Sequence, residues 1–204
     1  MKPRPAGTEG RTRSHILDVA EQLVQTRGFN SFSYADIAAA LSLSKPALHY
    51  HFPGKAELGL ALIQRYEQRF FNALSAVDGQ GAAARFEFYA NLYVGVLREQ
   101  RMCLCGMLAA EFKTLSAPMQ QAVVRFFDQN KDWLSTVLAQ GLAEGSLEFD
   151  GSPQEKAGVI IGSLEGAMLV ARLYDDLAVL QSTIGHLQSG FFATKPEEVP
   201  GQVI

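Results

Sequence analysis

Apolar residues recur at helical spacing along nearly the whole chain of 204 residues. Near the start, Ile16, Ala20 and Leu23 follow the three-to-four-residue period of an amphipathic helix, and a glycine stands at position 28, where the pattern stops. No segment shows the period-two alternation of a half-buried strand. The pattern therefore predicts an all-α fold of about nine helices. We expect them at residues 11–27, 33–41, 45–51, 55–77, about 86–96, 102–114, about 119–143, 153–176 and 177–192.

These predicted helices divide the chain into two unequal parts. A Pro-Gly pair at 53–54 separates the first three from the longer helices that follow. We expect residues 1–55 to form an N-terminal arm with a small three-helix domain, and residues 56–193 to form a larger helical domain. Residues 194–204 hold two prolines and two glutamates and are predicted to be a flexible tail.

Two short helices joined by a tight turn predict a helix-turn-helix unit in the small domain. Ser33 stands three residues before Asp36, which is the spacing of a capping box at a helix start. Ser44 can cap the next helix, and Pro46 is tolerated in the first turn of that helix.

The short helix at 45–51 can pack on one side and present hydrogen-bond donors on the other. Leu48 and Phe52 are four residues apart and can anchor its inner face. Lys45, His49 and Tyr50 then face outward, where a recognition helix meets base edges and phosphates. The candidate DNA-binding residues are Ser33, Ser44, Lys45, Pro46, Ala47, His49, Tyr50, His51 and Lys55.

Charge is unevenly distributed, and this asymmetry favours an anionic partner at one end of the molecule. The formal net charge is −3, but residues 1–55 hold seven basic and four acidic residues. The remainder holds eleven basic and 17 acidic residues. A basic N-terminal segment on an acidic body suits a nucleic-acid contact made by that segment alone. The alternative is a chance asymmetry, because the excess is small.

The block at residues 44–57, which reads Ser-Lys-Pro-Ala-Leu-His-Tyr-His-Phe-Pro-Gly-Lys-Ala-Glu, resembles the DNA-binding domain of the TetR family of transcriptional regulators. The family's usual form is Ser-Lys-Gly-x-Leu-Tyr-Tyr-His-Phe-x-x-Lys-x-Glu, so Pro46 replaces a common glycine and His49 a usual tyrosine. The resemblance covers about the first 60 residues. It implies a homodimer that binds a palindromic operator in double-stranded DNA, acts as a repressor and is released by a small-molecule effector. No cofactor is expected.

The same resemblance implies an effector cavity among the fifth to eighth helices. An apolar pocket lined by aromatic side chains would suit a hydrophobic small molecule. The alternative is that these aromatic residues form an ordinary core. The candidate effector-binding residues are Tyr89, Tyr93, Met107, Glu111, Phe127 and Trp133, with the carboxylate of Glu111 as a polar anchor.

Cys103 and Cys105 are the only cysteines, which suits a reducing cytoplasmic compartment and excludes a disulfide scaffold. A lone Cys-x-Cys pair lacks the four ligands of a tetrahedral zinc site, so no metal is expected. Arg98 and Arg101 lie just upstream, and a helix is predicted to begin near residue 102. These features predict a lowered thiol pKa and a possible electrophile sensor. The alternative is a pair of inert, buried cysteines.

Gly158, Gly162 and Gly166 recur every four residues on a helix that is apolar nearly all round. Such a helix needs cover on two sides, so we predict that these glycines and Val170 lie in a homodimer interface. The alternative is a helix buried within a single chain. The apolar stretch at 157–171 contains Glu165 and is shorter than the ~20 residues of a membrane span, so no membrane contact is expected.

An enzyme is not expected. His49 and His51 are two residues apart and do not share a helix face, while His15 and His186 lie far from one another in the sequence. No Gly-rich phosphate loop, His-Glu-x-x-His motif or nucleophile elbow occurs. The alternative to a regulator is a ligand-binding or adaptor protein of the same fold without specific DNA binding.

Overall fold

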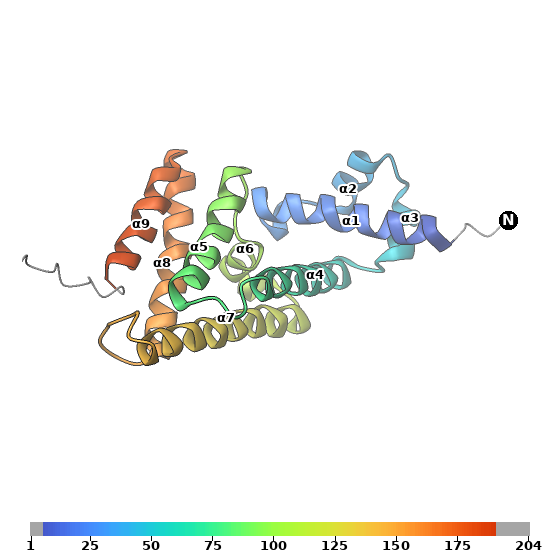
Figure 1. The fold of residues 1–204 in the computed structure, drawn as a ribbon. Helices are drawn as coiled ribbons and strands as arrows, with labels where there is room; N and C mark the ends of the chain where they lie inside the picture. The colour runs from blue at the N-terminus through green and yellow to red at the C-terminus, as the bar shows by residue number, and fades with distance from the viewer. Residues whose placement is uncertain (1–5, 191–204) are drawn as a thin grey trace, which may run out of the picture.

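The computed structural model describes residues 6–190, which form nine α-helices, two 3-10 helices and no strand (Figure 1). The all-α prediction is therefore confirmed. The predicted tail at 194–204 and residues 1–5 of the predicted arm lie outside the described residues. The elements are α1 Ala6–Arg27, η1 Phe29–Ser31, α2 Tyr34–Leu41, α3 Lys45–His51, α4 Lys55–Ser75, α5 Ala82–Arg98, α6 Leu104–Ala110, η2 Phe112–Thr114, α7 Ala117–Ala143, α8 Pro153–Tyr174 and α9 Leu177–Ser189.

The first helices form a small unit at one end of the molecule, which we call the head (α1, η1, α2 and α3). Ile16 of α1, Ile37 of α2 and Leu48 of α3 are fully buried and form its centre. These are the positions that the helical spacing selects, because each stands on the apolar stripe of its helix. The head is joined to the rest of the chain by α4 (Figure 1).

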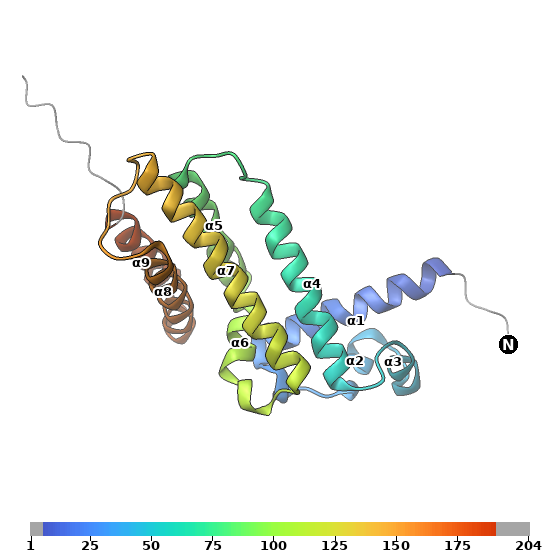
Figure 2. The ribbon, with the colours of Figure 1, turned by 90° about the horizontal axis from the view of Figure 1, so that it is seen from below.

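The remaining helices, α4 to α9, form a larger unit that we call the body. The long helices α4 and α7 pack side by side, and α5 packs on α7 (Figure 2). α8 packs against α7 and α9, and the α8–α9 pair stands at the end of the molecule away from α3 (Figure 1). The side chains between these helices form one continuous hydrophobic core with that of the head.

The predicted helix at 102–114 is wrong, because the structure contains the seven-residue α6 and then η2. The break falls at Glu111, whose carboxylate accepts hydrogen bonds from the backbone N–H groups of Phe29 at 2.6 Å and Asn30 at 3.2 Å. The corner between α6 and η2 is thus fixed by the head, a long-range contact with no local sequence pattern. α1 also begins earlier than expected, at Ala6 rather than at residue 11.

α8 is longer than the apolar stretch at 157–171 suggests. By length and composition alone it could cross a membrane, and among residues 6–190 no other helix passes that test. Its inner face carries Ile160, Leu164 and Met168, which are fully buried in the body. This inner face packs as the core-facing side of an amphipathic helix does in a globular protein.

The opposite face of α8 is uncovered. A Cβ atom built on Gly158, Gly162 or Gly166 would meet no atom within 4 Å. Val170 is 43% exposed and Leu173 is 76% exposed on the same helix. The four residues predicted to form a dimer interface are therefore all accessible in the single chain.

The start of α8 is closed by a capping box. The Ser152 hydroxyl accepts a hydrogen bond from Glu155 N at 3.2 Å, and the Glu155 carboxylate accepts one from Ser152 N at 2.9 Å. Ser152→Ala is expected to lower the free energy of unfolding by ~1 kcal/mol, measured by urea denaturation. Ser75→Ala is the control, because this exposed hydroxyl contacts only its own helix at Phe71 O. Equal losses in the two variants would contradict the assigned role of the cap.

Candidate DNA-binding site and effector cavity

The helix-turn-helix unit is built from local hydrogen bonds. Ser33 caps α2 in a reciprocal capping box with Asp36, whose carboxylate accepts from Ser33 N at 2.7 Å. Ser42 ends α2 with a left-handed φ of 53°, and Leu43 N donates to Ala38 O at 3.0 Å. These contacts turn the chain sharply and fix the angle between α2 and α3.

Ser44 is the N-cap of α3, and its hydroxyl accepts a hydrogen bond from Ala47 N at 3.3 Å. Pro46 lies in the first turn of α3. Backbone N–H groups there have no acceptor within the helix, so a proline costs no hydrogen bond. Leu48 and Phe52 are buried, so the predicted inner face of α3 is present.

The outer face of α3 presents polar side chains to solvent. Lys45 is exposed, and Tyr50 is 72% exposed. The Tyr50 hydroxyl donates to Glu9 of α1 at 3.2 Å, and its ring contacts that of His51 at 5.2 Å. Cationic and hydroxyl donors on one accessible helix face have the chemistry needed to contact DNA phosphates and base edges.

His49 is exposed but is held by its neighbours. Its Nδ1 lies 3.0 Å from Pro53 O, and its ring lies 4.8 Å from that of Tyr34. Tyr34 in turn donates its hydroxyl hydrogen to Phe52 O at 2.9 Å, which ties the first turn of α2 to the end of α3. Partial burial raises the pKa of Tyr34 to about 12, so this donor keeps its proton. Sequence reasoning misses Tyr34, since only its position after the Ser33 cap marks it.

The structure places Lys55 between the head and the body. Its ammonium group points inward, donates to Phe32 O and lies over the rings of Phe29 and Phe32 at 4.7 and 4.3 Å. Burial lowers the pKa of Lys55, and the charges of Glu111 and Asp36 oppose that change. Lys55 therefore packs the junction of head and body and does not stand beside Lys45 on the outer face.

An apolar cavity of about 170 Å³ lies in the body between α4, α5 and α8. Phe70, Leu92, Val96 and Met168 supply hydrocarbon walls, and Arg69 is the charged member of the lining. The full lining consists of Tyr66, Arg69, Phe70, Ala73, Leu92, Tyr93, Val96, Cys103 and Met168.

Of the predicted effector-binding residues, Tyr93 lines this cavity and the others do not. Tyr89 and Trp133 lie behind it: the Tyr89 hydroxyl is 3.0 Å from that of Tyr93, and the Tyr89 ring stacks on Trp133 at 5.6 Å. Phe127 packs on the ring of Phe126 at 5.4 Å.

Two further predicted residues serve contacts elsewhere. The thioether sulfur of Met107 lies 3.7 Å from a guanidinium nitrogen of Arg172. Glu111 holds the backbone of η1, as described above, so it is not a polar anchor in this cavity. The lining residues that sequence reasoning misses come largely from α4, where Tyr66 and Phe70 look like an ordinary core stripe.

The structure also corrects the expected acidity of the cysteines. Burial is the largest cause that raises the pKa of Cys103 well above its usual value, and the Glu165 carboxylate adds to it. Cys105 is fully buried and its pKa is raised for the same two reasons. Arg101, one of the two upstream arginines, forms an ion pair with Glu99.

Glu165 of α8 lies beside Cys103, a residue of the cavity lining. Its Oε1 atom is buried and finds no hydrogen-bond partner in the described part of the chain. Burial raises the pKa of Glu165 to about 7, and a hydrogen bond from Cys103 partly opposes that shift. Gly106 makes room for this carboxylate, since a Cβ there would stand 2.2 Å from Oε2.

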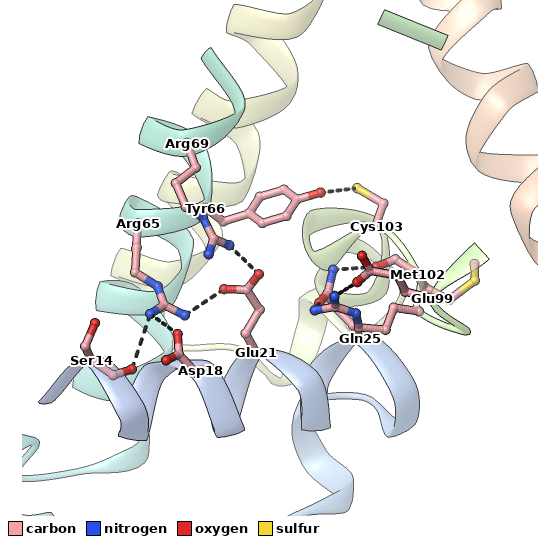
Figure 3. Close-up of polar contacts among 11 residues, drawn as sticks. Ser14, Asp18, Glu21, Gln25, Arg65, Tyr66, Arg69, Glu99, Met102 and Cys103 are labelled. Atoms are coloured by element: carbon pink, nitrogen blue, oxygen red, sulfur yellow. Dashed lines mark hydrogen bonds and ion pairs between the residues drawn. The ribbon is translucent and has the colours of Figure 1, made fainter. Parts of the chain in front are cut away.

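Two sets of polar contacts tie α1 of the head to the body (Figure 3). In the first, the buried carboxylate of Glu21 accepts from Arg65 at 2.8 Å and also from Arg69, both on α4. Arg65 additionally donates to Asp18 at 2.7 Å and to Ser14 O at 3.3 Å. Helix α4 of the body thus contacts one face of α1 through charged side chains.

The second set lies at the end of α1. Gln25 Nε2 donates to Met102 O at 2.9 Å, and Met102 N donates to Gln25 O at 3.1 Å (Figure 3). Met102 directly precedes Cys103, a residue of the cavity lining. The cavity wall is therefore one residue away from a direct backbone contact with the head.

The described residues contain no group of three or more His, Cys, Asp or Glu side chains that could hold a metal ion. What they do contain is an exposed donor-bearing helix in a helix-turn-helix head, joined by α4 to a helical body with an apolar cavity. This is the architecture of a helix-turn-helix transcriptional regulator.

Family models identify the chain more closely. Residues 16–62 match the model described as "Bacterial regulatory proteins, tetR family", and residues 83–187 match "Tetracyclin repressor-like, C-terminal domain". The chain belongs to the TetR family of DNA-binding transcriptional regulators, as the motif at 44–57 indicates.

Individual relatives agree with this assignment along most of the chain. A TetR-family regulator from Agrobacterium tumefaciens superposes with a TM-score of 0.88 at 28% identity, over 91% of this chain and 100% of that one. Transcriptional regulator AcuR of Cereibacter sphaeroides is 26% identical over 96% of this chain and 92% of its own length. The transcriptional repressor DhaR of Mycobacterium sp. (strain GP1) is 23% identical, with 77% and 80% covered. All three relatives are described as transcriptional regulators.

The raised pKa of Glu165 predicts a specific pH dependence of stability. Between pH 4.5 and about 7 the folded chain keeps a proton that the unfolded chain releases, so stability falls as pH rises through that window and then levels off. Glu165→Gln removes this loss, and its stability gain over wild type should grow by roughly 3 kcal/mol between pH 4.5 and pH 8. Urea denaturation at both pH values measures it. The exposed Glu148→Gln variant should show no such growth, and a parallel response of both variants would refute the assignment.

The raised pKa of Cys103 predicts a thiol that reacts slowly in the folded chain. Burial keeps it protonated at pH 7.5, so alkylation by iodoacetamide should be at least about tenfold slower in native protein than in urea-unfolded protein. Mass spectrometry of quenched samples gives both rates. A native rate equal to or above the unfolded rate would instead indicate an activated thiolate.

Proposed function

We propose that the protein is a one-component repressor that binds a palindromic operator as a homodimer and is released by a small hydrophobic effector. The observation that carries the proposal is the direct connection between cavity and head. Arg69 lines the cavity and also holds Glu21 of α1, while Met102 beside the cavity wall pairs with Gln25. An occupant of the cavity therefore acts on groups that position the DNA-reading helix. The place of action is the cytoplasm.

Residues 1–55 are assigned to DNA binding and residues 56–193 to effector binding and dimerisation. Lys45 and Tyr50 are the principal DNA contacts, supported by their exposure on the outer face of α3. Ser33 and Ser44 position the two helices through their caps, and His51 lies beside Tyr50.

Dimerisation is assigned to the uncovered face of α8. Gly158, Gly162, Gly166 and Val170 leave an apolar surface on which a second copy can approach closely. Two heads on one twofold axis would engage two half-sites together, and the affinity of the pair exceeds that of either head alone. Any change in the separation of the heads then weakens binding.

Release follows from movement of α4, which carries the head and contributes Tyr66, Phe70 and Ala73 to the cavity. A ligand that separates α4 from α5 changes the angle at which α4 holds the head. The repressor DhaR among the relatives supports this direction of control.

The electrophilic trigger expected at Cys103 is disfavoured, although Cys103 lines the cavity and follows Met102, the backbone partner of Gln25. Burial raises the pKa of this thiol well above its usual value, so little reactive thiolate is present. A small electrophile should therefore release the operator equally well from wild type and from Cys103→Ser. Release from wild type alone would restore this trigger.

The proposal is tested by selecting bound fragments from sheared genomic DNA of the source organism. Wild type should enrich a short palindrome, and Lys45→Ala/Tyr50→Ala should lose that enrichment because both donors leave the outer face of α3. Lys113→Ala/Lys131→Ala removes exposed charges from the body and should enrich the same sites. If wild type and the α3 double variant enrich DNA equally, or not at all, the ligand-binding or adaptor alternative is favoured.

A further inference from the structure

Arg69 stands at the boundary between two hollows of the molecule. On one side it lines the apolar cavity of about 170 Å³. On the other it lines a polar cleft of about 550 Å³ between α1 and residues 99–101, together with Glu21 and Arg101. The Arg69 side chain is 51% exposed, whereas that of its partner Glu21 is 7% exposed. Arg69 can thus meet a solute from solvent while its partner stays fixed.

Arg69 also has free hydrogen-bonding capacity. A guanidinium group carries five N–H donors in a planar fork. Within residues 6–190, Arg69 donates only through Nη2, to Oε1 of Glu21. Arg69 is a lining residue of both the polar cleft and the apolar cavity.

We propose that the effector is a small apolar carboxylic acid, whose hydrocarbon part fills the cavity and whose carboxylate binds Arg69 in competition with Glu21. This inference rests on the proposed function and names the effector class and the first event of release. The acid is recognised by its chemistry: a carboxylate matches the guanidinium fork, and apolar walls match the tail.

The walls of the cavity set the orientation of the ligand. Phe70, Leu92, Val96 and Met168 offer hydrocarbon and no charge. The carboxyl group of Glu165 lies by Cys103 of the lining, and the buried side chains of Tyr66 and Tyr93 lie near it. A second carboxylate is disfavoured there, so the charged end of the ligand belongs at Arg69 and its tail points inward.

Competition by the ligand weakens the ion-pair contacts between α4 and α1 but does not remove all of them. Glu21 keeps its 2.8 Å contact with Arg65, which also holds Asp18, when Arg69 turns toward a ligand. Glu21 of α1 is then paired with one arginine of α4 instead of two. Coupling of this kind is reciprocal, so the acid weakens operator binding by the factor by which the operator weakens acid binding.

The first test measures ligand binding by the purified full-length protein in the absence of DNA. Isothermal titration calorimetry compares hexanoate and benzoate with hexanamide and benzamide, which have nearly the same shape but no charge. Both acids should bind at least about tenfold more tightly than their amides, because only the acids form a charge-assisted pair with Arg69. Equal binding of acids and amides, or no binding by either acid, would overturn the inference.

Substitutions test whether the carboxylate of the ligand pairs with Arg69. Arg69→Met should weaken hexanoate binding by about tenfold or more, while hexanamide binding stays unchanged. Arg125→Met is the matched control, because Arg125 pairs with Glu67 on the outside of the body and does not line the cavity. Glu21→Gln removes the competitor and should tighten hexanoate binding, which a merely structural role for Glu21 would not do. Thermal melting of each variant checks that it is folded.

Failure of the inference can be distinguished from failure of the proposed function. The Lys45→Ala/Tyr50→Ala variant should bind hexanoate as wild type does, since neither residue lines the cavity and α3 lies away from α5 and α8 (Figure 1). Acid binding without any selected operator would refute the proposed function and leave the ligand assignment intact. A selected palindrome that hexanoate and benzoate do not release, from a protein that binds neither, would keep the regulator and refute the acid effector.

Discussion

The position of the head depends above all on one buried carboxylate. Glu21 lies within the first helix of the chain, yet its two oxygens are held by Arg65 and Arg69 of α4. A carboxylate out of water is costly unless charged donors replace its hydration, so removing either arginine leaves part of that cost uncompensated. The angle between α1 and α4 is therefore set by charge pairing as well as by apolar packing. An anion that competes for the arginines can therefore weaken the contact between α1 and α4, whereas it would not weaken a purely hydrophobic contact.

This contact is strengthened by contacts from other segments. Glu111 holds the backbone of η1, and Gln25 pairs with Met102. Each contact links residues more than 75 positions apart, so each forms only when head and body are docked together. The head thus has its own helix caps, while its orientation is fixed by contacts with the body.

Local features of the molecule could be predicted from the sequence because their physical causes are local. Ser33 and Asp36 form the capping box that their spacing indicates, and Ser44 and Pro46 mark the start of α3. The cavity could not be predicted in this way, since Tyr66 on its wall has the same helical register as residues in the core.

Lys55 and Cys103 show more clearly what cannot be predicted from a local sequence motif. Sequence spacing places Lys55 beside the recognition helix and Cys103 beside arginines, which suggests a phosphate contact and an acidic thiol. In the fold, Lys55 turns onto two phenylalanine rings, and Cys103 is buried near a carboxylate. Desolvation depends on which segments pack together, and that information is absent from a local motif.

The paired contacts between Gln25 and Met102 have a dynamic consequence. The Met102 amide is buried and donates to an oxygen of the head, although Met102 itself belongs to the body. It can exchange its hydrogen with solvent only when α1 lifts away. The exchange rate of this single amide is therefore set by the free energy of undocking the head, a quantity distinct from the free energy of global unfolding. Hydrogen exchange at the Met102 amide therefore reports how strongly the head and the body are coupled.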